Sequence, residues 1–493
     1  MKILLVYPKY INTFWSFKDA LKFISKKATH PPLGLLTVAA MLPKDWEKKV
    51  VDMNVTPLKN KDLEWADYVF ISAMSIQTES AKEIISRCRK VGVKTVAGGP
   101  LFTTGYEEFE DVDHFVLNEA EITLPLFLAD LKKGCAKHVY SSEEFPDIEK
   151  APIPLWELIN MKEYATMSIQ YSRGCPFNCE FCNITALFGH KVRTKSTAHI
   201  LRELENIYSQ GWRGDVFFVD DNFIGRKRRL KTETLPAIIE WMEKRKYPFF
   251  FNTEASINLS DDEELMQLMV RAGFNSVFVG IETVNEESLA ECNKVQNENR
   301  DLLASVKKIQ KFGLQVQGGF IVGFDNDPPS IFERLIEFIQ ESGIVTAMVG
   351  LLNAPRSTKL YQRLVKEGRL LKDVSGDNTD FSINFVPKMD YETLMEGYKR
   401  IIRRIYSPEP YFKRVMEFLR HYKPLGERKF HFNFTYIVAF FKSILFLGIL
   451  GRERLYYWKL FFWSLFRRPQ IFHLAITFSI YGFHFRKVFK ECL

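Results

Sequence analysis

The spacing of three cysteines constrains this chain more than any other feature. Cys175, Cys179 and Cys182 stand in the string RGCPFNCEFCN, with the spacing C-x3-C-x2-C. Three thiolates on one short loop can bind three irons of a [4Fe–4S] cube, because soft thiolate ligands suit iron–sulfur clusters. Such clusters usually take four cysteines, and no fourth cysteine lies close in the sequence. One iron would then stay open to bind a small molecule, so the spacing predicts a reactive cluster in place of an electron carrier.

Zinc and disulfides are the alternative uses of these cysteines. A structural zinc site needs a fourth Cys or His ligand, and His190, which follows the motif, leaves a Cys3His site open. Disulfides are disfavoured by the odd total of 7 cysteines and by residues 1–8, which predict a buried strand and no secretory signal. We therefore expect a reduced, cytoplasmic protein. The other cysteines are expected to be packing or surface residues: Cys88, Cys135, Cys292 and Cys492.

The residue before the last cysteine, Phe181, is aromatic, and with it the motif resembles the signature of the radical S-adenosylmethionine (SAM) enzymes. In that family SAM chelates the open iron through its amino and carboxylate groups. The resemblance implies a [4Fe–4S] cluster on the three cysteines, bound SAM, and a partial (β/α)6 barrel around both. Gly174 lets the loop wrap tightly. Arg173 either favours a negatively charged cluster or forms a surface salt bridge.

Short apolar runs alternate with helical stretches over residues 1–145. The expected strands are Lys2–Tyr7, Tyr68–Ser72, 94–97 and 114–117, and the expected helices are Leu33–Met41 and 79–91. This alternation predicts a parallel, doubly wound, Rossmann-like sheet, which binds ligands at the carboxyl ends of its strands. Small residues at two such ends let a ligand approach the backbone, although a tight turn explains the two glycines equally well. These residues are Ser72, Ser75, Gly98 and Gly99.

A Rossmann-like domain before a radical SAM motif is similar to the cobalamin-binding subgroup of that family. The string HPPLGLL from His30 looks like the early helix start of the subgroup, and NEAE from Asn118 resembles the segment that closes its domain. The resemblance implies that Ser72, Ser75, Gly98 and Gly99 surround the corrin ring and its nucleotide tail.

One departure from the cobalamin pattern is informative. Many cobalamin proteins carry D-x-H-x-x-G, whose histidine binds cobalt. The matching string here begins Asp52-Met53-Asn54, so Asn54 stands where the histidine would be. We therefore predict bound cobalamin without a histidine ligand from the protein, as is often the case in the radical SAM subgroup.

A second domain is predicted for residues 150–385. Strands are expected at 165–170, 215–219, 249–252, 276–279, 316–322 and 344–352. A helical stretch separates each strand from the next. Six such strands match the partial barrel of the radical SAM enzymes, whose active site lies at the carboxyl ends of the strands.

Polar and small residues recur at those strand ends. Taken singly, each acid is explained as a solvated or capping residue, but their recurrence after the cysteine loop favours a site. The resemblance implies contacts with the SAM amino group after the second strand, with the ribose hydroxyls or the substrate after the third and fourth, and with adenine along the fifth. The candidates, in that order, are Asp220, Asp221 and Asn222, then Glu254, then Glu282, then Gly319 and Gly323.

The C-terminal region, residues 386–493, is expected to be mainly helical. Residues 413–493 carry 15 Lys and Arg but 4 Asp and Glu, whereas the whole chain has a formal net charge of +8. Residues 436–450 form an apolar stretch that is short for a membrane span, which needs about 20 residues. Interleaved aromatic and basic residues favour two readings equally, a membrane interface or an aromatic helical bundle on the barrel. Nucleic-acid binding is disfavoured by the apolar density.

Taken together, the layout is most similar to the class B radical SAM methyltransferases that bind cobalamin, in particular the group containing the hopanoid C-2 methylase. The resemblance implies methylation of an unactivated carbon of a hydrophobic, hopanoid-like substrate. It also implies an electron donor such as flavodoxin or ferredoxin, in a protein that is cytoplasmic or peripheral at the inner face of the membrane. Two rival hypotheses stay open: a cobalamin-dependent rearrangement or cyclisation without methyl transfer, and a non-catalytic cobalamin or redox sensor.

Overall fold

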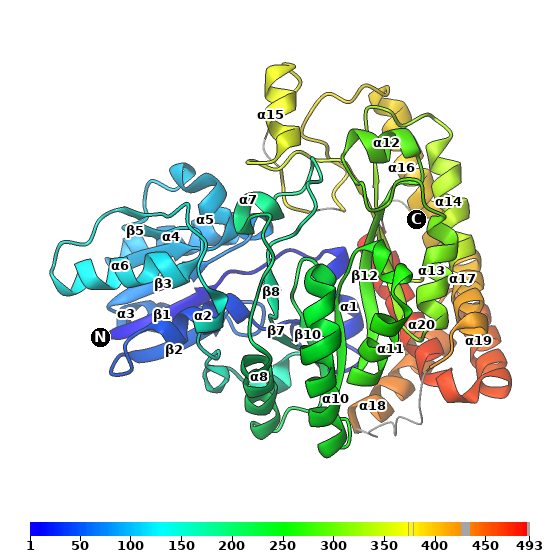
Figure 1. Cartoon of the computed structure of the whole chain (residues 1–493), viewed down its shortest axis with the longest axis horizontal. Helices are drawn as coiled ribbons and strands as arrows, with labels where there is room; N and C mark the ends of the chain where they lie inside the picture. Colours follow the sequence, from blue (N-terminus) through cyan, green and yellow to red (C-terminus); the bar gives the residue numbers. More distant parts are fainter. Residues whose placement is uncertain (373, 378, 425–433, 491–493) are drawn as a thin grey trace.

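The computed structural model describes the chain except for residues 373, 378, 425–433 and 491–493, so Cys492 lies outside the described residues. Three parts lie side by side in Figure 1: an N-terminal α/β domain, a central barrel and a bundle of C-terminal helices. This is the predicted α/β class with a Rossmann-like domain, a partial barrel and a helical C-terminal region.

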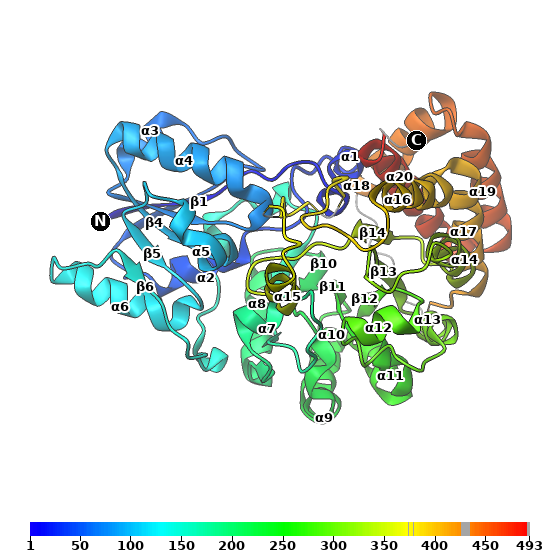
Figure 2. The same ribbon diagram turned by 90° about the horizontal axis from the view of Figure 1, so that it is seen from above.

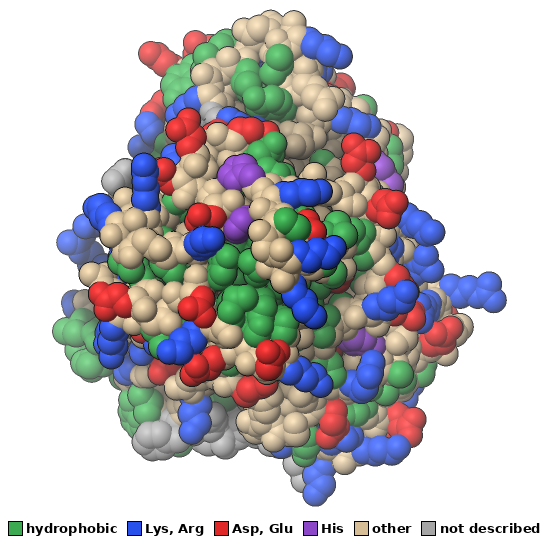
Figure 3. Space-filling model, turned by 90° about the vertical axis from the view of Figure 1, so that its left-hand side faces the viewer, with side chains coloured by type: hydrophobic (Ala, Val, Ile, Leu, Met, Phe, Trp, Pro, Cys, Tyr) green, Lys and Arg blue, Asp and Glu red, His purple; other side chains and the backbone are tan. Residues whose placement is uncertain are grey.

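The N-terminal domain is a parallel sheet with the strand order β2-β1-β3-β4-β5-β6. Its strands are β1 (Lys2–Tyr7), β2 (Glu47–Asp52), β3 (Tyr68–Ser72), β4 (Lys94–Gly98), β5 (His114–Val116) and β6 (Val139–Tyr140). One face is covered by α3 (Asn60–Trp65), α4 (Thr78–Val91) and α5 (Pro100–Gly105), and the other by α2 (Leu33–Met41) and α6 (Ala120–Lys132). Acidic and basic side chains are interspersed on the surface that this end of the molecule presents (Figure 3).

The two edge strands, β2 and β6, were not predicted from the sequence. β2 is exposed at Glu47 and Lys49 and also carries Lys48, so it lacks the continuous apolar run of a central strand. β6 is only 2 residues long. Both edge strands therefore form by pairing with a neighbouring strand, and their own sequences lack a pattern that predicts a strand.

The barrel is a parallel sheet with the order β14-β13-β12-β11-β10-β7. Its strands are β7 (Met167–Ile169), β10 (Gly214–Phe218), β11 (Phe249–Glu254), β12 (Phe274–Glu282), β13 (Gln315–Val322) and β14 (Ala347–Leu351). The longer helices around it are α8 (Thr197–Ser209), α10 (Leu235–Lys244), α11 (Glu263–Ala272), α13 (Leu302–Lys311) and α14 (Ile331–Ser342). Short helices in its loops are α7 (Ile184–Phe188), α9 (Lys227–Arg229), α12 (Glu286–Glu291) and α15 (Lys359–Lys366).

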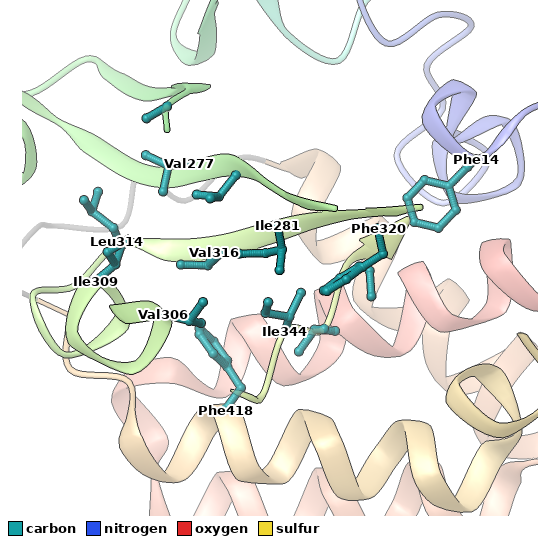
Figure 4. Packing of buried hydrophobic residues seen from close by; sticks show 14 of the residues in the cluster. Phe14, Val277, Ile281, Val306, Ile309, Leu314, Val316, Phe320, Ile344 and Phe418 are labelled. Carbon is teal, nitrogen blue, oxygen red and sulfur yellow. The ribbon is translucent and has the colours of Figure 1, made fainter. Parts of the chain in front are cut away.

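The alternation of residues along β12 separates the core from the cavity inside the barrel. Val277 and Ile281 pack toward the surrounding helices, together with Val316 of β13 and Val306 of α13 (Figure 4). Ser276, Phe278 and Glu282 instead line the cavity. Because successive side chains of a strand point to opposite faces, the same strand builds the core and the site.

The barrel sheet is open between β7 and β14, and segments distant in sequence close this side. The N-terminal segment, with η1 (Phe14–Ser16) and α1 (Lys18–Leu21), leaves the first domain and pairs through Ala28 with Tyr164, just before β7. Phe14 stacks on Phe485 with ring centroids 4.3 Å apart. Figure 2 shows α1 and α20 next to each other on this side. The prediction of a contiguous domain over residues 1–145 did not include this excursion.

The C-terminal helices complete the enclosure. They are α16 (Tyr391–Tyr406), α17 (Pro408–His421), α18 (Phe434–Ser443) with its π-helical extension η10 (Ile444–Ile449), α19 (Arg454–Arg467) and α20 (Phe472–Val488). The hydroxyls of Tyr398 and Tyr406 donate hydrogen bonds of 3.1 and 2.6 Å to carbonyls of β14, which fixes α16 along that edge strand. Pro408 begins α17, as its missing N–H permits. Among the described residues, the structure contains no helix with the length and hydropathy of a membrane span.

Candidate active site

The cysteine loop lies between a two-stranded ribbon, β8 (Ser172–Arg173) with β9 (Arg193–Thr194), and the helix α7. Gly174 has φ of +89°, and a Cβ there would lie 2.9 Å from the carbonyl oxygens of Gly189 and Lys191. Only glycine fits this left-handed and crowded position. The N–H of Cys175 donates to the carbonyl of Gly189 at 3.3 Å, so the loop is closed tightly in front of the first cysteine, as predicted.

The surroundings of the cysteine thiols suit their ligation to a metal. Burial raises the pKa of the Cys182 thiol to about 12, so its thiolate needs a nearby positive charge, which ligated iron supplies. His190, the fourth ligand of the zinc alternative, is exposed. Among the described residues, no group of three His, Cys, Asp or Glu side chains is arranged to hold one metal ion. The thiolates of a cube bind three different irons and need not converge on one point.

A loop after α12 covers the cysteines and was missed by the sequence reasoning. The Cys292 carbonyl accepts a hydrogen bond of 2.9 Å from the N–H of Glu180. Gln296 Nε2 donates to Cys179 Sγ at 3.8 Å. Cys292 itself is buried, and its thiol donates to the Leu289 carbonyl at 3.5 Å. The loop follows a strand end of the barrel, which is the one signal in the sequence that could have pointed to it.

Asp220 and Asn222 are used within the protein. The carboxylate of Asp220 accepts hydrogen bonds from the N–H of Tyr171 at 3.1 Å and from the Ser172 hydroxyl at 2.5 Å. It thereby ties β10 to the backbone that leads into the cysteine loop. Asn222 Oδ1 accepts from the N–H and the hydroxyl of Ser256, each at 3.3 Å. The predicted contact of these two residues with the SAM amino group stays a prediction, and their observed partners indicate a positioning role.

Asp221 and Glu254 are the acids of this group that are available to a ligand. Oδ2 of Asp221 is buried with no hydrogen-bond partner, and burial raises the pKa of its carboxyl to about 6. Glu254 lines the cavity, and burial, reinforced by the charges of Asp221 and Asp220, raises its pKa to about 8. Two desolvated carboxyls that disfavour each other's ionisation fit a cationic ligand, because a positive charge between them stabilises both anions.

Glu282 is already paired. It has φ of +64° at the end of β12, a conformation that is uncommon for a residue with a side chain. Its Oε1 accepts a hydrogen bond of 2.5 Å from Nζ of Lys294, and both side chains are about nine-tenths buried. Burial works to lower the pKa of Lys294, but the charges of Glu282 and Cys179 together outweigh it and hold the pKa above its ordinary value. Glu282 therefore places a cation beside the cysteine loop.

The barrel encloses a cavity of about 2180 Å³. It begins at Cys182, Glu254 and Glu282 and runs past Gly319 on β13. A Cβ on Gly319 would lie 2.7 Å from the ring of Phe278, so the strand presents bare backbone there. Gly323, with φ of +105°, turns the chain after β13, and its N–H donates to Asp327 at 2.9 Å. The predicted contact of these glycines with adenine stays a prediction.

The four small residues predicted for cobalamin gather at the carboxyl edge of the N-terminal sheet. Ser72 pairs with Gly98 in the β3–β4 register. Gly99 has φ of +91°, and a Cβ there would lie 2.8 Å from the Ser72 hydroxyl. Ser75 begins the next turn, and the backbone at Gly376 packs against it and Ile76. The glycines are thus required by the backbone of the protein itself, and their predicted contact with the corrin stays a prediction.

Asn54 has local partners. Its side chain donates to Asp52 Oδ1 at 2.8 Å and accepts from the N–H of Tyr10 at 3.0 Å. The other carboxylate oxygen of Asp52 accepts a hydrogen bond of 3.0 Å from the hydroxyl of Tyr164, which belongs to the barrel domain. Asn54 therefore holds the end of β2 and is not presented as a ligand.

A buried charge network joins the cysteine loop to the N-terminal domain. Arg173 donates to Glu119 at 2.5 Å and to Glu121 at 2.8 and 3.0 Å, and Arg193 donates to Glu119 at 2.6 Å. The side chains are between 3% and 13% exposed. Arg173 therefore forms a salt bridge, but a buried one and not the surface pair of the alternative explanation, while its predicted effect on the charge of a cluster stays a prediction.

Three family models match the chain in the order of these parts. The B12 binding domain matches residues 23–128, the Radical SAM superfamily matches residues 169–339, and a domain of unknown function (DUF4070) matches residues 358–493. The cysteine loop and the acids at the barrel strand ends fall inside the second match, and Ser72, Gly98 and Gly99 inside the first. Fold and site thus define a cobalamin-binding radical SAM enzyme.

Relatives along nearly the whole chain narrow this class. An uncharacterized methyltransferase of Synechocystis sp. is 40% identical over 98% of this chain and 91% of its own. The hopanoid C-2 methylase of Rhodopseudomonas palustris is 32% identical over 93% of this chain and 88% of its own. The radical SAM methyltransferase TsrM from Kitasatospora setae, solved with cobalamin and a [4Fe–4S] cluster bound, shares the fold with a TM-score of 0.61 at 14% identity, over 96% of this chain and 99% of its own. The chain belongs to the cobalamin-dependent radical SAM methyltransferases, whose cofactors are those predicted.

Proposed function

We propose that the protein methylates an unactivated carbon of a hydrophobic, hopanoid-like lipid. The observation that carries the proposal is the cavity inside the barrel. Its volume, about 2180 Å³, exceeds the roughly 300–1,000 Å³ of an ordinary small-molecule site. It therefore has room for a nucleotide and a second, bulky ligand. The likeness to the hopanoid C-2 methylase supports the same substrate class.

The two ends of the cavity differ in chemistry. Near the cysteine loop its lining includes the carboxyl groups of Glu254 and Glu282. Where the C-terminal helices line the cavity, the side chains are mostly aromatic and aliphatic, such as Phe440 of α18 and Ile476 and Ile480 of α20, with fewer polar ones such as His473. A rigid polycyclic hydrocarbon gains free energy by burial at the apolar end, while a charged nucleotide is held at the polar end.

Each group of residues at the site has a separate role in this function. Cys175, Cys179 and Cys182 would hold the cluster, and Asp221 and Glu254 would face the sulfonium cation of SAM. When bound, the reduced cluster with SAM supplies a hydrogen-abstracting radical, and cobalamin supplies the methyl group. The apolar wall orients the substrate carbon and excludes water. The Arg173 network fixes the N-terminal domain relative to the barrel.

Anaerobic reconstitution tests this function. The protein is loaded with iron, sulfide and cobalamin and supplied with a reductant, methyl-labelled SAM and hopanoid lipid, and lipids of cells with and without the gene are compared by mass spectrometry. We expect 5′-deoxyadenosine together with a labelled lipid that is one methyl group heavier. Deoxyadenosine with a rearranged but unmethylated product would indicate the rearrangement or cyclisation hypothesis. No deoxyadenosine at all would indicate the sensor.

Proton release should accompany SAM binding. With a pKa of about 8, Glu254 holds its proton at pH 7 in the ligand-free protein, and a bound cation favours its ionised form. The affinity for SAM should therefore rise with pH up to about pH 8, by about one logarithmic unit per pH unit, and level off above. Calorimetry in buffers of different ionisation heat should detect about one more proton released by the wild type than by Glu254→Gln.

The control for this measurement is Glu287→Gln, which removes an exposed carboxyl after the next strand of the barrel. It should release as many protons as the wild type. Equal proton release by the wild type and Glu254→Gln would show that Glu254 does not face the cation.

A further inference from the structure

Helix α19 lies on the surface but is apolar on both of its faces. Tyr457 and Leu460 are buried against the neighbouring helices. On the opposite side Leu455, Phe462 and Phe466 are 78%, 50% and 76% exposed. A helix that is hydrophobic all round is normally covered on every side. The apolar composition of α19 therefore predicts that its outer face is buried, whereas this face is exposed in the structure.

The preceding helix continues this exposed apolar surface. Phe441, Leu445 and Ile449 follow one another at successive turns of α18 and η10 and are 63%, 45% and 56% exposed. Trp458 of α19 donates a hydrogen bond of 2.9 Å to the carbonyl of Gly448, which ties the two helices together. We call α18, η10 and α19 the apolar hairpin. Its exposed apolar residues are Tyr436, Phe441, Leu445, Phe446, Ile449, Leu450, Leu455, Phe462, Leu465 and Phe466.

The charges on the hairpin are almost all positive. Arg452, Arg454, Lys459 and Arg467 are exposed. Its one acid, Glu453, accepts a hydrogen bond of 2.8 Å from Arg486. Exposed aliphatic and aromatic side chains flanked by cations complement an anionic lipid surface, where the rings enter the headgroup region and the cations meet phosphates.

The cavity of the barrel reaches this hairpin. Tyr436 and Phe441 of α18 line the cavity and are 42% and 63% exposed, and Phe441 also belongs to the exposed row of α18 and η10. Lys442 holds α18 against the N-terminal segment by donating to the Lys22 carbonyl at 2.8 Å. The wall of the cavity is thus continuous with the exposed apolar surface.

We propose that the apolar hairpin docks the protein on an anionic lipid bilayer and that the lipid substrate passes from the bilayer into the cavity along α18. The second half of this inference rests on the proposed function, whereas the first half does not. A second copy of the chain would also cover apolar surface. However, a two-fold symmetric contact would place one basic surface with Arg452, Arg454 and Lys459 against the same surface of the other copy, and repulsion between these like charges favours the bilayer.

Vesicle flotation with the full chain tests the docking. We expect the protein to float with vesicles of equal parts phosphatidylcholine and phosphatidylglycerol, and about tenfold less with phosphatidylcholine alone. The double variant Phe462→Glu and Phe466→Glu should reduce binding to the anionic vesicles by about tenfold or more, because it places charge on the face that enters the bilayer. Leu126→Glu, at an exposed apolar position on α6, should float like the wild type.

A protein that stays at the bottom of the gradient with both kinds of vesicle would overturn the docking. So would light scattering that shows a dimer dissociated by the double variant. Phe462 and Phe466 do not line the cavity, so the double variant should form deoxyadenosine at the wild-type rate. The substrate route is tested separately, because this variant should lose methylation of vesicle-embedded lipid and keep that of detergent-dissolved lipid. Equal loss of both would contradict the route.

Removal of the C-terminal region is not an equivalent experiment. Nε2 of the buried His484 lies 3.0 Å from the carbonyl of Phe14, and the ring of Phe485 stacks on that of Phe14. A deletion would therefore expose the closed side of the barrel and change folding as well as binding.

Discussion

Replacing Cys182 with alanine will remove the iron–sulfur absorption of the reconstituted protein and abolish formation of 5′-deoxyadenosine. Loss of one of three thiolates leaves two irons of the cube without a protein ligand, and the loop has no side chain that takes its place. Loss of a hydrogen-bond partner of a metal ligand already lowers metal affinity or activity by about 10–100-fold. Because Cys182 is a ligand itself, we expect deoxyadenosine formation to decrease by more than about a hundredfold. Absorption spectroscopy and deoxyadenosine assays on oxygen-free protein measure both effects, and the same result is expected for Cys175 and Cys179.

Cys292→Ala is the matched control, because Cys292 is the one other cysteine that the structure places beside this loop among its described residues. Burial, with the nearby charge of Glu282, raises the pKa of its thiol far above the ordinary range. The thiol also donates to a carbonyl, so it is not a ligand. This variant should keep the cluster and the deoxyadenosine activity. Loss of both would mean that the cube is fully ligated by the protein and has no iron free for SAM.

The parts of the site that the sequence predicted are those encoded over a few neighbouring residues. The cysteine spacing is local, and the apolar runs of β1, β3 and β10 predict buried strands without further information. Glu254 could be placed because a carboxyl directly after a parallel strand falls at the active edge of a barrel. Each inference needed only the residue and its neighbours in the chain.

Other parts depend on partners far away in the sequence. The segment at Phe14 lies outside its own domain, where the ring of Phe14 stacks on that of Phe485 near the other end of the chain. Lys294 and Gln296 sit in a polar loop without periodicity, and only the folded barrel brings them to the cysteines. Asp220 shows a further limit: its position at a strand end was read correctly, but its oxygens are occupied by Tyr171 and Ser172.

Arg173→Gln should uncouple methyl transfer from SAM cleavage. Arg173 lies two residues before the first cysteine, and its guanidinium joins Glu119 and Glu121 of the N-terminal domain. Removing one member of a buried charge network costs about 3–5 kcal/mol, because the remaining charges are left unpaired. The N-terminal domain should then shift relative to the barrel. A misplacement of about 1 Å can cost roughly a hundredfold in rate. This loss should affect methyl transfer, because that step needs both the N-terminal domain and the barrel.

The measurement is the ratio of methylated product to 5′-deoxyadenosine formed in the same sample. We expect this ratio to fall by about tenfold or more, while deoxyadenosine formation changes far less, and the thermal unfolding temperature to decrease. Glu119→Gln, on the other side of the interface, should give the same ratio with an intact cluster. Arg202→Gln, which removes an exposed arginine on α8 outside the cavity lining, should leave ratio and stability unchanged.

The pH dependence of the network gives an independent check. Burial works to raise the pKa of Glu121, but the charge of Arg173 and its hydrogen bonds outweigh burial, so the pKa lies below its ordinary value. The ionised pair therefore contributes its full stability above the unfolded pKa of about 4.3 and loses it as the pH falls further. Arg173→Gln should thus be less stable than the wild type at neutral pH, and the difference should shrink below about pH 4. A parallel loss of both products, together with the cluster, would instead show that Arg173 supports the cysteine loop alone.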